Sequence, residues 1–130
     1  MSIQTAHIKT VHYVHLSDVN RPIVPVLDQA KIAAMRAGIA NQPRPQLRAG
    51  VDTNKQFYTA AEVDHHSDTL PAIDIMTVSA DGKRVFFGFG GCHRFQSYLA
   101  EGWDLIPVKL MPCSKSSLGL YLGASAAKFF

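Results

Sequence analysis

The sequence predicts an α+β fold, with one small domain in which helices pack against a mixed sheet. Its 130 residues are the length of a single domain, and a hydrophobic content of 47% is enough for one core. Segments with the alternating pattern of strands and segments with helical spacing follow one another along the chain. Their predicted order is strand, helix, hairpin, helix, strand and a last short helix. We therefore treat residues 1–130 as one domain.

The first part of the chain predicts a strand followed by a helix. Residues 12–16 alternate as a strand does, and Pro22 ends any ladder that they begin. Asp28 is a suitable helix N-cap because its carboxylate can accept bonds from the first free N–H groups. The apolar stripe predicted for the helix behind it consists of Ala30, Ile32, Ala33, Met35 and Ile39.

Residues 41–70 predict an inserted loop. The segment holds two prolines, one glycine and scattered polar residues, with one weak helical pattern at 59–64. So long a connection in a small domain is typical of an insertion. His65 and His66 lie inside it, but adjacent histidines lack metal-ligand spacing, so we interpret them as loop residues.

The second half predicts the remaining elements from short local patterns. A turn at 80–83 separates two alternating segments, which predicts a hairpin. The elements are a hairpin of residues 71–78 and 84–89, a helix over 92–101 ended by Gly102, a strand over 104–111, and a short helix after Ser114 or Ser116.

Charge and cysteine content narrow the class of partner. The net charge is +3 and the pI about 9.0, but the cations are dispersed, so a small anionic ligand fits as well as nucleic acid. We expect no nucleic-acid partner and no membrane partner, since no apolar stretch approaches the length of a span. Cys92 and Cys113 show neither disulfide-framework nor zinc spacing, so no metal site is expected. With no signal-peptide pattern at the start, the sequence predicts a cytoplasmic protein, with the nucleus also open.

The chemistry concentrates where the second predicted helix begins, after the run VFFGFGG. Gly90 and Gly91 allow a tight turn and a close approach to a ligand. The free N–H groups of the helix start favour an anion such as phosphate, to which Arg94 can add a bidentate grip and His93 a further donor. In the same positive surroundings the thiolate form of Cys92 is favoured. A phosphate site and a nucleophilic thiol are thus predicted in one place.

Two other interpretations of this junction remain open on spacing alone. A Gly-Gly turn between strand and helix is common, and a cysteine beside it is often a small buried apolar residue. A Cys–His hydrolase is a poorer interpretation, because Cys92 and His93 are neighbours on a helix and do not face each other.

Four short motifs occur in the order seen in one known family. They are residues 89–94 (FGGCHR), residues 21–28 (RPIVPVLD) followed by Lys31, residues 71–74 (PAID) and residues 121–125 (YLGAS). Together they resemble the sulfiredoxins over most of the chain, and the inserted segment is similar to that of fungal members. The resemblance implies the ParB/sulfiredoxin fold.

The resemblance also implies a reaction. Sulfiredoxins use ATP with Mg²⁺ to reduce the cysteine sulfinic acid of hyperoxidised 2-Cys peroxiredoxins to sulfenic acid. The implied route runs through a sulfinic phosphoryl ester and a thiosulfinate with Cys92, which an external thiol such as thioredoxin or glutathione resolves. The expected partners are therefore the peroxiredoxin and a thiol reductant.

Roles for single residues follow from the same resemblance. Cys92 and Arg94 are implied as catalytic, and Lys31 as a nucleotide ligand together with the residues at 90–94. Arg21 is implied near the mouth of the site, and Asp28 as both helix cap and orienting partner of the cations. The implied peroxiredoxin-docking residues are Pro22, Phe89 and Tyr121.

The chain departs from the family pattern at two positions after Lys31. Several relatives carry Ser and Thr three and seven residues beyond this lysine, where this chain has Ala34 and Gly38. Two hydrogen bonds to the nucleotide are then missing, so its adenosine must be held differently.

A rival interpretation is a ParB-like nucleotide-dependent binding module without redox chemistry. Such proteins share the fold, and residues 91–94 loosely match their glycine turn. That interpretation predicts a DNA-binding segment downstream, which this chain lacks, and it leaves Cys92 without a role.

Overall fold

The computed structural model describes residues 10–21, 26–65, 70–80, 82–88, 91–114 and 116. No helix in this part of the chain is long and apolar enough to cross a membrane. The elements, in chain order, are β1 (His12–His15), the 3-10 turn η1 (Leu16–Asp18), β2 (Val19–Asn20), α1 (Gln29–Ile39), β3 (Gln46–Leu47), β4 (Tyr58–Thr59), the 3-10 turn η2 (Ala60–Glu62), β5 (Val63–Asp64), β6 (Ile73–Ala80), β7 (Lys83–Phe87), α2 (Cys92–Ala100) and β8 (Leu105–Cys113).

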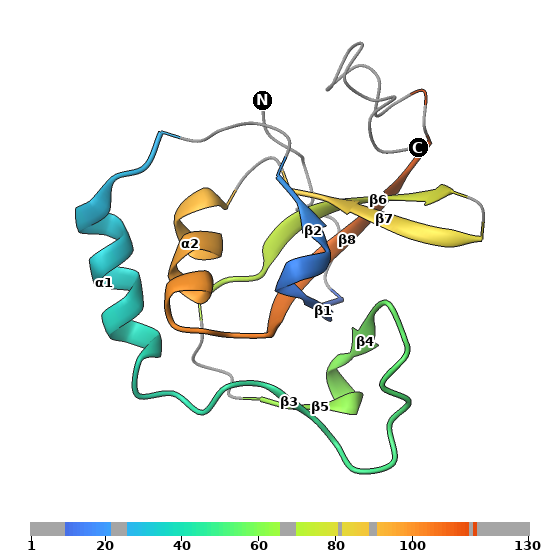
Figure 1. The fold of residues 1–130 in the computed structure, drawn as a ribbon, viewed down its shortest axis with the longest axis horizontal. Coiled ribbons are helices and arrows are strands. Elements are labelled where there is room, and N and C mark those ends of the chain that lie inside the picture. Colours follow the sequence, from blue (N-terminus) through green and yellow to red (C-terminus); the bar gives the residue numbers. More distant parts are fainter. Residues whose placement is uncertain are drawn as a thin grey trace.

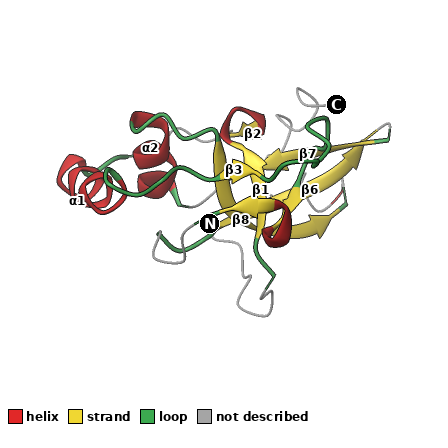
Figure 2. Cartoon of the chain, turned by 90° about the horizontal axis from the view of Figure 1, so that it is seen from below, coloured by secondary structure: helices red, strands yellow, loops and turns green. Residues whose placement is uncertain are grey.

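The main sheet is mixed, with strand order β2-β7-β6-β8-β1-β4. β2 runs parallel to β7 and β6 parallel to β8, whereas the other neighbouring pairs are antiparallel. Both helices lie on one side of it, with α2 between α1 and the sheet (Figures 1 and 2). The predicted α+β fold, a mixed sheet with helices packed against it, is confirmed.

The hairpin of β6 and β7 forms as its alternating sequence predicts. Met76 lies opposite Phe87 and Val78 opposite Val85. Because side chains alternate between the two faces of a strand, Ile73 and Ile75 join the core that contains the helix residues. Met76 and Val78 join a second cluster on the opposite face.

Helix α1 begins where the sequence predicts but buries a narrower face. Asp28 is its N-cap, and Oδ1 accepts bonds from the N–H groups of Ala30 and Lys31 at 3.0 and 3.3 Å. Of the predicted stripe only Ile32 and Ile39 are buried, and Ala30 and Ala33 are exposed. The reason is that α1 packs mainly on α2 rather than on the sheet, so it needs little apolar surface.

The segment predicted as an inserted loop at 41–70 contains three two-residue strands and η2 in its described part. β3 and β5 form a small sheet of their own, and β4 pairs with β1 at an edge of the main sheet. Gln56 uses its side-chain amide to bind both backbone groups of Arg84 in β7, at 2.8 and 2.9 Å.

Four chain segments meet beside the start of α2. Arg21 just after β2, the cap of α1 and the residues just before β6 contact the first turn of α2, and Gly88 just after β7 lies next to Arg21. Several predicted features lie outside the described residues, namely Pro22, His66, Phe89, Gly90, Tyr121 and the helix after Ser114 or Ser116.

Candidate active site

Gly91 forms the turn that begins α2. It is the N-cap residue, with φ 66° and ψ 28°, a left-handed conformation that side chains disfavour. A Cβ here would lie 2.9 Å from Ile73 Cγ2 and 3.3 Å from Arg94 Nη2. The first helical bond joins Phe95 N–H to Gly91 O at 2.9 Å. The amides of Cys92, His93 and Arg94 precede that bond, so the helix itself does not use them.

Cys92 is paired with Arg21. Arg21 Nη2 donates a hydrogen bond to Cys92 Sγ at 2.8 Å, although the two residues are 71 positions apart. Burial lowers the pKa of Arg21, while the charge of Cys92 and the hydrogen bond to it raise that pKa. Because a guanidinium stays protonated in proteins, it places a fixed positive charge on the sulfur. The nucleophilic form of a cysteine is the thiolate, and a cation in contact with the sulfur attracts that form more strongly than the neutral thiol.

This position of Arg21 is closer to the chemistry than the sequence suggested. The resemblance implied a place at the mouth of the site, whereas the structure places the guanidinium on the sulfur itself. Its Cζ also lies 4.9 Å from the centre of the Phe95 ring, a cation–π contact. Phe95 is thus a site residue that the sequence did not identify, since its helical position also fits a core role.

His93 is held by the cap of the other helix. The backbone N–H of Asp28 donates to His93 Nε2 at 2.9 Å. An accepting Nε2 carries no proton, so in this arrangement the imidazole proton is on Nδ1, where it can be donated to a ligand. Asp28 therefore orients a site residue through its backbone, while its carboxylate caps α1. Among the described residues no hydrogen bond joins His93 to Cys92, so the two do not form a dyad in this structure.

Arg94 is fixed against the start of β6. Its Nη1 donates to the carbonyls of Pro71 and Ala72 at 3.0 and 2.8 Å. Nη2 lies beside Gly91, as the short distance to a Cβ built there shows. The guanidinium is thus held by one nitrogen, and the edge formed by Nε and Nη2 remains for a bidentate contact with a ligand. Lys31, exposed in the first turn of α1, is the remaining predicted nucleotide ligand in the described part of the chain.

Cys113 lies far from Cys92 and on another face of the sheet. It is opposite Val78, five residues along β6 from Ile73, which contacts Gly91. At about 3.3 Å per residue, the two cysteines are separated by on the order of 15 Å. Cys113 packs against the cluster of Met76, Val78 and Phe87, and burial raises its pKa. A disulfide needs Cα atoms within about 7 Å, so this fold does not bring the two cysteines together.

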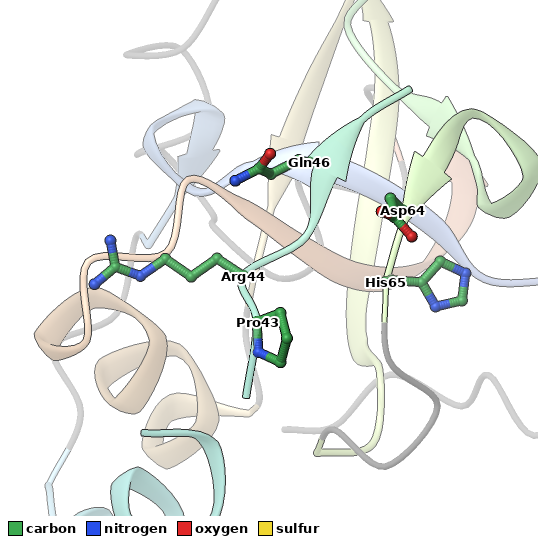
Figure 3. Close-up of a pocket in the computed structure, with 5 residues that line it drawn as sticks. All are labelled: Pro43, Arg44, Gln46, Asp64 and His65. Carbon is green, nitrogen blue, oxygen red and sulfur yellow. The ribbon is translucent and has the colours of Figure 1, made fainter. Parts of the chain in front are cut away.

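A cavity of about 410 Å³ lies elsewhere, beside the small β3–β5 sheet (Figure 3). It is lined by Pro43, Arg44, Gln46, Asp64 and His65. Arg44 lies over Gly102, at the far end of α2 from Cys92. The cavity therefore does not belong to the cysteine site.

Comparison with known proteins shows which family this chain is similar to. A family model, the ParB N-terminal domain, matches residues 1–126. A sulfiredoxin of Schizosaccharomyces pombe is 34% identical over 98% of this chain and 95% of its own length. A sulfiredoxin of Saccharomyces cerevisiae is 30% identical over 96% of this chain and 97% of its own.

A solved structure shows the same fold. The crystal structure of a sulfiredoxin from Arabidopsis thaliana superposes with a TM-score of 0.57 at 21% identity, covering 88% of this chain and 98% of that one. The ParB N-terminal domain describes the fold that both interpretations of the sequence share, and the two yeast relatives distinguish between them. The chain therefore belongs to the sulfiredoxin family, whose members are oxidoreductases that reduce the cysteine sulfinic acid of peroxiredoxins.

Proposed function

We propose that this chain reduces the sulfinic acid of hyperoxidised 2-Cys peroxiredoxins in an ATP-dependent reaction with Cys92 as the nucleophile. The observation that carries the proposal is the hydrogen bond from Arg21 to Cys92 Sγ at the N-terminus of α2. It holds a positive charge against the sulfur, next to a helix start that favours anions.

The reaction needs phosphate chemistry because a sulfinate has no good leaving group. Oxide is not displaced by a thiolate, so one sulfinate oxygen must first be made into a better leaving group. ATP supplies a phosphoryl group for this purpose, and Mg²⁺ carried by its phosphates offsets their charge. The product of that transfer is a sulfinic phosphoryl ester.

The residues at the start of α2 fit a phosphate group. The helix itself does not use the amides of Cys92, His93 and Arg94, so they are available to an anion. A Cβ at Gly91 would crowd Ile73 and the guanidinium of Arg94. The Nδ1 proton of His93 and the Nε–Nη2 edge of Arg94 add donors, and Lys31 adds a positive charge. These groups stabilise negative charge as it develops on the transferring phosphate.

The sulfur steps then follow from the thiolate. Cys92 Sγ attacks the activated sulfur, the S–O bond to phosphate breaks, and a thiosulfinate joins the two proteins. An external thiol attacks Cys92 Sγ, which releases the peroxiredoxin as sulfenic acid and leaves a mixed disulfide. A second thiol reduces that disulfide and restores Cys92, so the pair of thiols supplies the two electrons.

The adenosine is held without side-chain hydrogen bonds from two positions of α1. Ala34 and Gly38 are both exposed on this helix and offer neither donor nor acceptor beyond the backbone. We therefore propose that binding energy for the nucleotide comes mainly from its phosphates.

One assay tests the proposal. The chain is incubated with ATP, Mg²⁺, a thioredoxin system and a hyperoxidised 2-Cys peroxiredoxin, and the sulfinate peptide is followed by mass. The expected result is the loss of the sulfinate only when ATP is present. Persistence of the sulfinate, or its equal loss without ATP, would contradict the proposal.

Cys113→Ser is expected to leave thioredoxin-dependent turnover unchanged. The reason is the separation of Cys113 from Cys92, which leaves the intermediate to an external thiol. The measurement is the rate of sulfinate loss with thioredoxin, together with non-reducing mass mapping of trapped mixtures. A trapped Cys92–Cys113 bridge, or a collapse of turnover in this variant, would make Cys113 the resolving residue.

A further inference from the structure

Gly88 lies beside Arg21 in the sheet. It directly follows β7, it is buried, and its N–H donates to Asn20 O at 2.9 Å. This bond continues the parallel pairing in which Val19 lies opposite Phe86 and Asn20 opposite Phe87. The next residue of each strand is Arg21 and Gly88, so the backbone at Gly88 is held at a fixed distance from that of Arg21.

The space over Gly88 is already filled. A Cβ built there would collide with Arg21 Nη1 and would lie 3.3 Å from both Ile75 Cδ1 and Val19 Cγ1. Val19 and Ile75 are core residues with 7% and 0% exposure, so neither can yield easily. Of the three neighbours the guanidinium, at the end of a long side chain, must therefore move, by about 1 Å to reach an ordinary contact distance.

The guanidinium cannot move without cost to the thiolate. Its Nη1 lies next to Gly88, its Cζ lies 4.9 Å from the centre of the Phe95 ring, and its Nη2 donates to Cys92 Sγ at 2.8 Å. Phe95 is 7% exposed and belongs to the core, so the ring that the guanidinium contacts is itself held in place. Because the same guanidinium binds both the ring and the sulfur, we expect a Cβ at residue 88 to disturb the Nη2–Sγ hydrogen bond.

We propose that Gly88 is a positioning residue for the nucleophile, because the absence of a side chain at this position lets Arg21 rest on Cys92. Gly88 touches no reacting atom and acts only through Arg21. This proposal rests on the proposed function, in which Cys92 is the nucleophile. What Gly88 is proposed to change is the reactivity of the Cys92 thiol alone.

The test measures alkylation of Cys92 by iodoacetamide at pH 7, without ATP or peroxiredoxin. Gly88→Ala is expected to slow this reaction on the order of tenfold. The reason is that a charged hydrogen bond to the sulfur is weakened or lost. Peptide mapping separates Cys92 from Cys113, which serves as an internal reference with an unchanged rate.

The other ionisable groups around the start of α2 are the same in Gly88→Ala and in the unchanged chain. They are His93 and Arg94 on α2, and Asp28 and Lys31 at the start of α1. The matched control is Gly38→Ala, because a Cβ at Gly38 meets nothing within 4 Å. Its alkylation rate should stay within twofold of the unchanged chain, and an equal slowing in this control would overturn the proposal.

The route through Arg21 is tested by a double-mutant cycle. Arg21→Gln should itself slow alkylation, and Gly88→Ala should add less than a twofold effect in that background. A tenfold effect of Gly88→Ala both with and without Arg21 would show that Gly88 acts through packing and would overturn the proposal. An unchanged rate in Gly88→Ala alone would do the same.

A measurement of stability covers the case in which Gly88→Ala does not fold. The shorter side chain in Arg21→Gln removes the collision, so the double variant should fold and melt well above Gly88→Ala alone. A double variant as unstable as the single one would contradict the proposal. If the unchanged chain fails to reduce sulfinate but the alkylation results hold, the proposed function fails while the role of Gly88 stands.

Discussion

Cys92→Ser is expected to abolish sulfinate reduction while leaving nucleotide binding close to normal. A serine hydroxyl is not ionised near neutral pH, so the guanidinium of Arg21 has no thiolate to stabilise and the attack on sulfur is lost. The phosphate cradle consists largely of backbone amides at the start of α2, which the substitution leaves in place. The measurements are sulfinate loss by mass and nucleotide binding by calorimetry.

The matched control is Cys113→Ser, which removes the other free thiol at a distance from the site. It should keep full turnover in the same assay. Retained turnover in Cys92→Ser would contradict the proposed mechanism, because the other cysteine, Cys113, does not lie near the start of α2.

Arg94→Lys is expected to lower kcat/KM by about thirtyfold or more, a loss of about 2 kcal/mol or more in transition-state stabilisation that approaches the scale of one oxyanion-type donor. A lysine has one nitrogen, so it cannot both hold the carbonyls of Pro71 and Ala72 and present a fork to phosphate. We expect the loss mainly in kcat, since the positive charge itself is kept.

Arg36→Lys is the matched control for this change. Arg36 forms a surface ion pair with Glu101 at 2.9 Å, and such pairs contribute up to about 1 kcal/mol. Its turnover should be unchanged, and thermal melting of both variants separates folding from catalysis. A folded Arg94→Lys protein within twofold of the unchanged chain would show that Arg94 serves only to hold β6.

The parts of the fold that depend on neighbours in sequence were predictable. The cap at Asp28 acts on amides two and three residues later, and the hairpin joins strands separated by a short turn. The start of α2 after Gly91 also follows from local signals. The exposed Ala30 and Ala33 were mispredicted, because spacing alone does not tell how much of a helix its neighbour covers.

The contacts that define the site span long stretches of sequence and could not be predicted from spacing. Arg21 meets Cys92 only because β2 pairs in parallel with β7, and that pairing has no local signal. In the sequence, Gly88 is one of three glycines in a short run and nothing distinguishes it. Its proposed role depends on the Arg21 guanidinium, which lies next to it only in the fold. The bond between Asp28 N–H and His93 likewise needs the two helices to be placed side by side.

The amide of Gln56 has a consequence for how this molecule behaves at high concentration. β2 pairs with β7 only at Phe86 and Phe87, so the earlier part of β7 is an edge of the sheet. Edge strands with unpaired N–H and C=O groups can pair with strands of other molecules, which is one route to aggregation. By binding both backbone groups of Arg84, Gln56 occupies the position that such a strand would take. We therefore expect the Gln56 side chain to block pairing with a strand of another molecule at this position of β7.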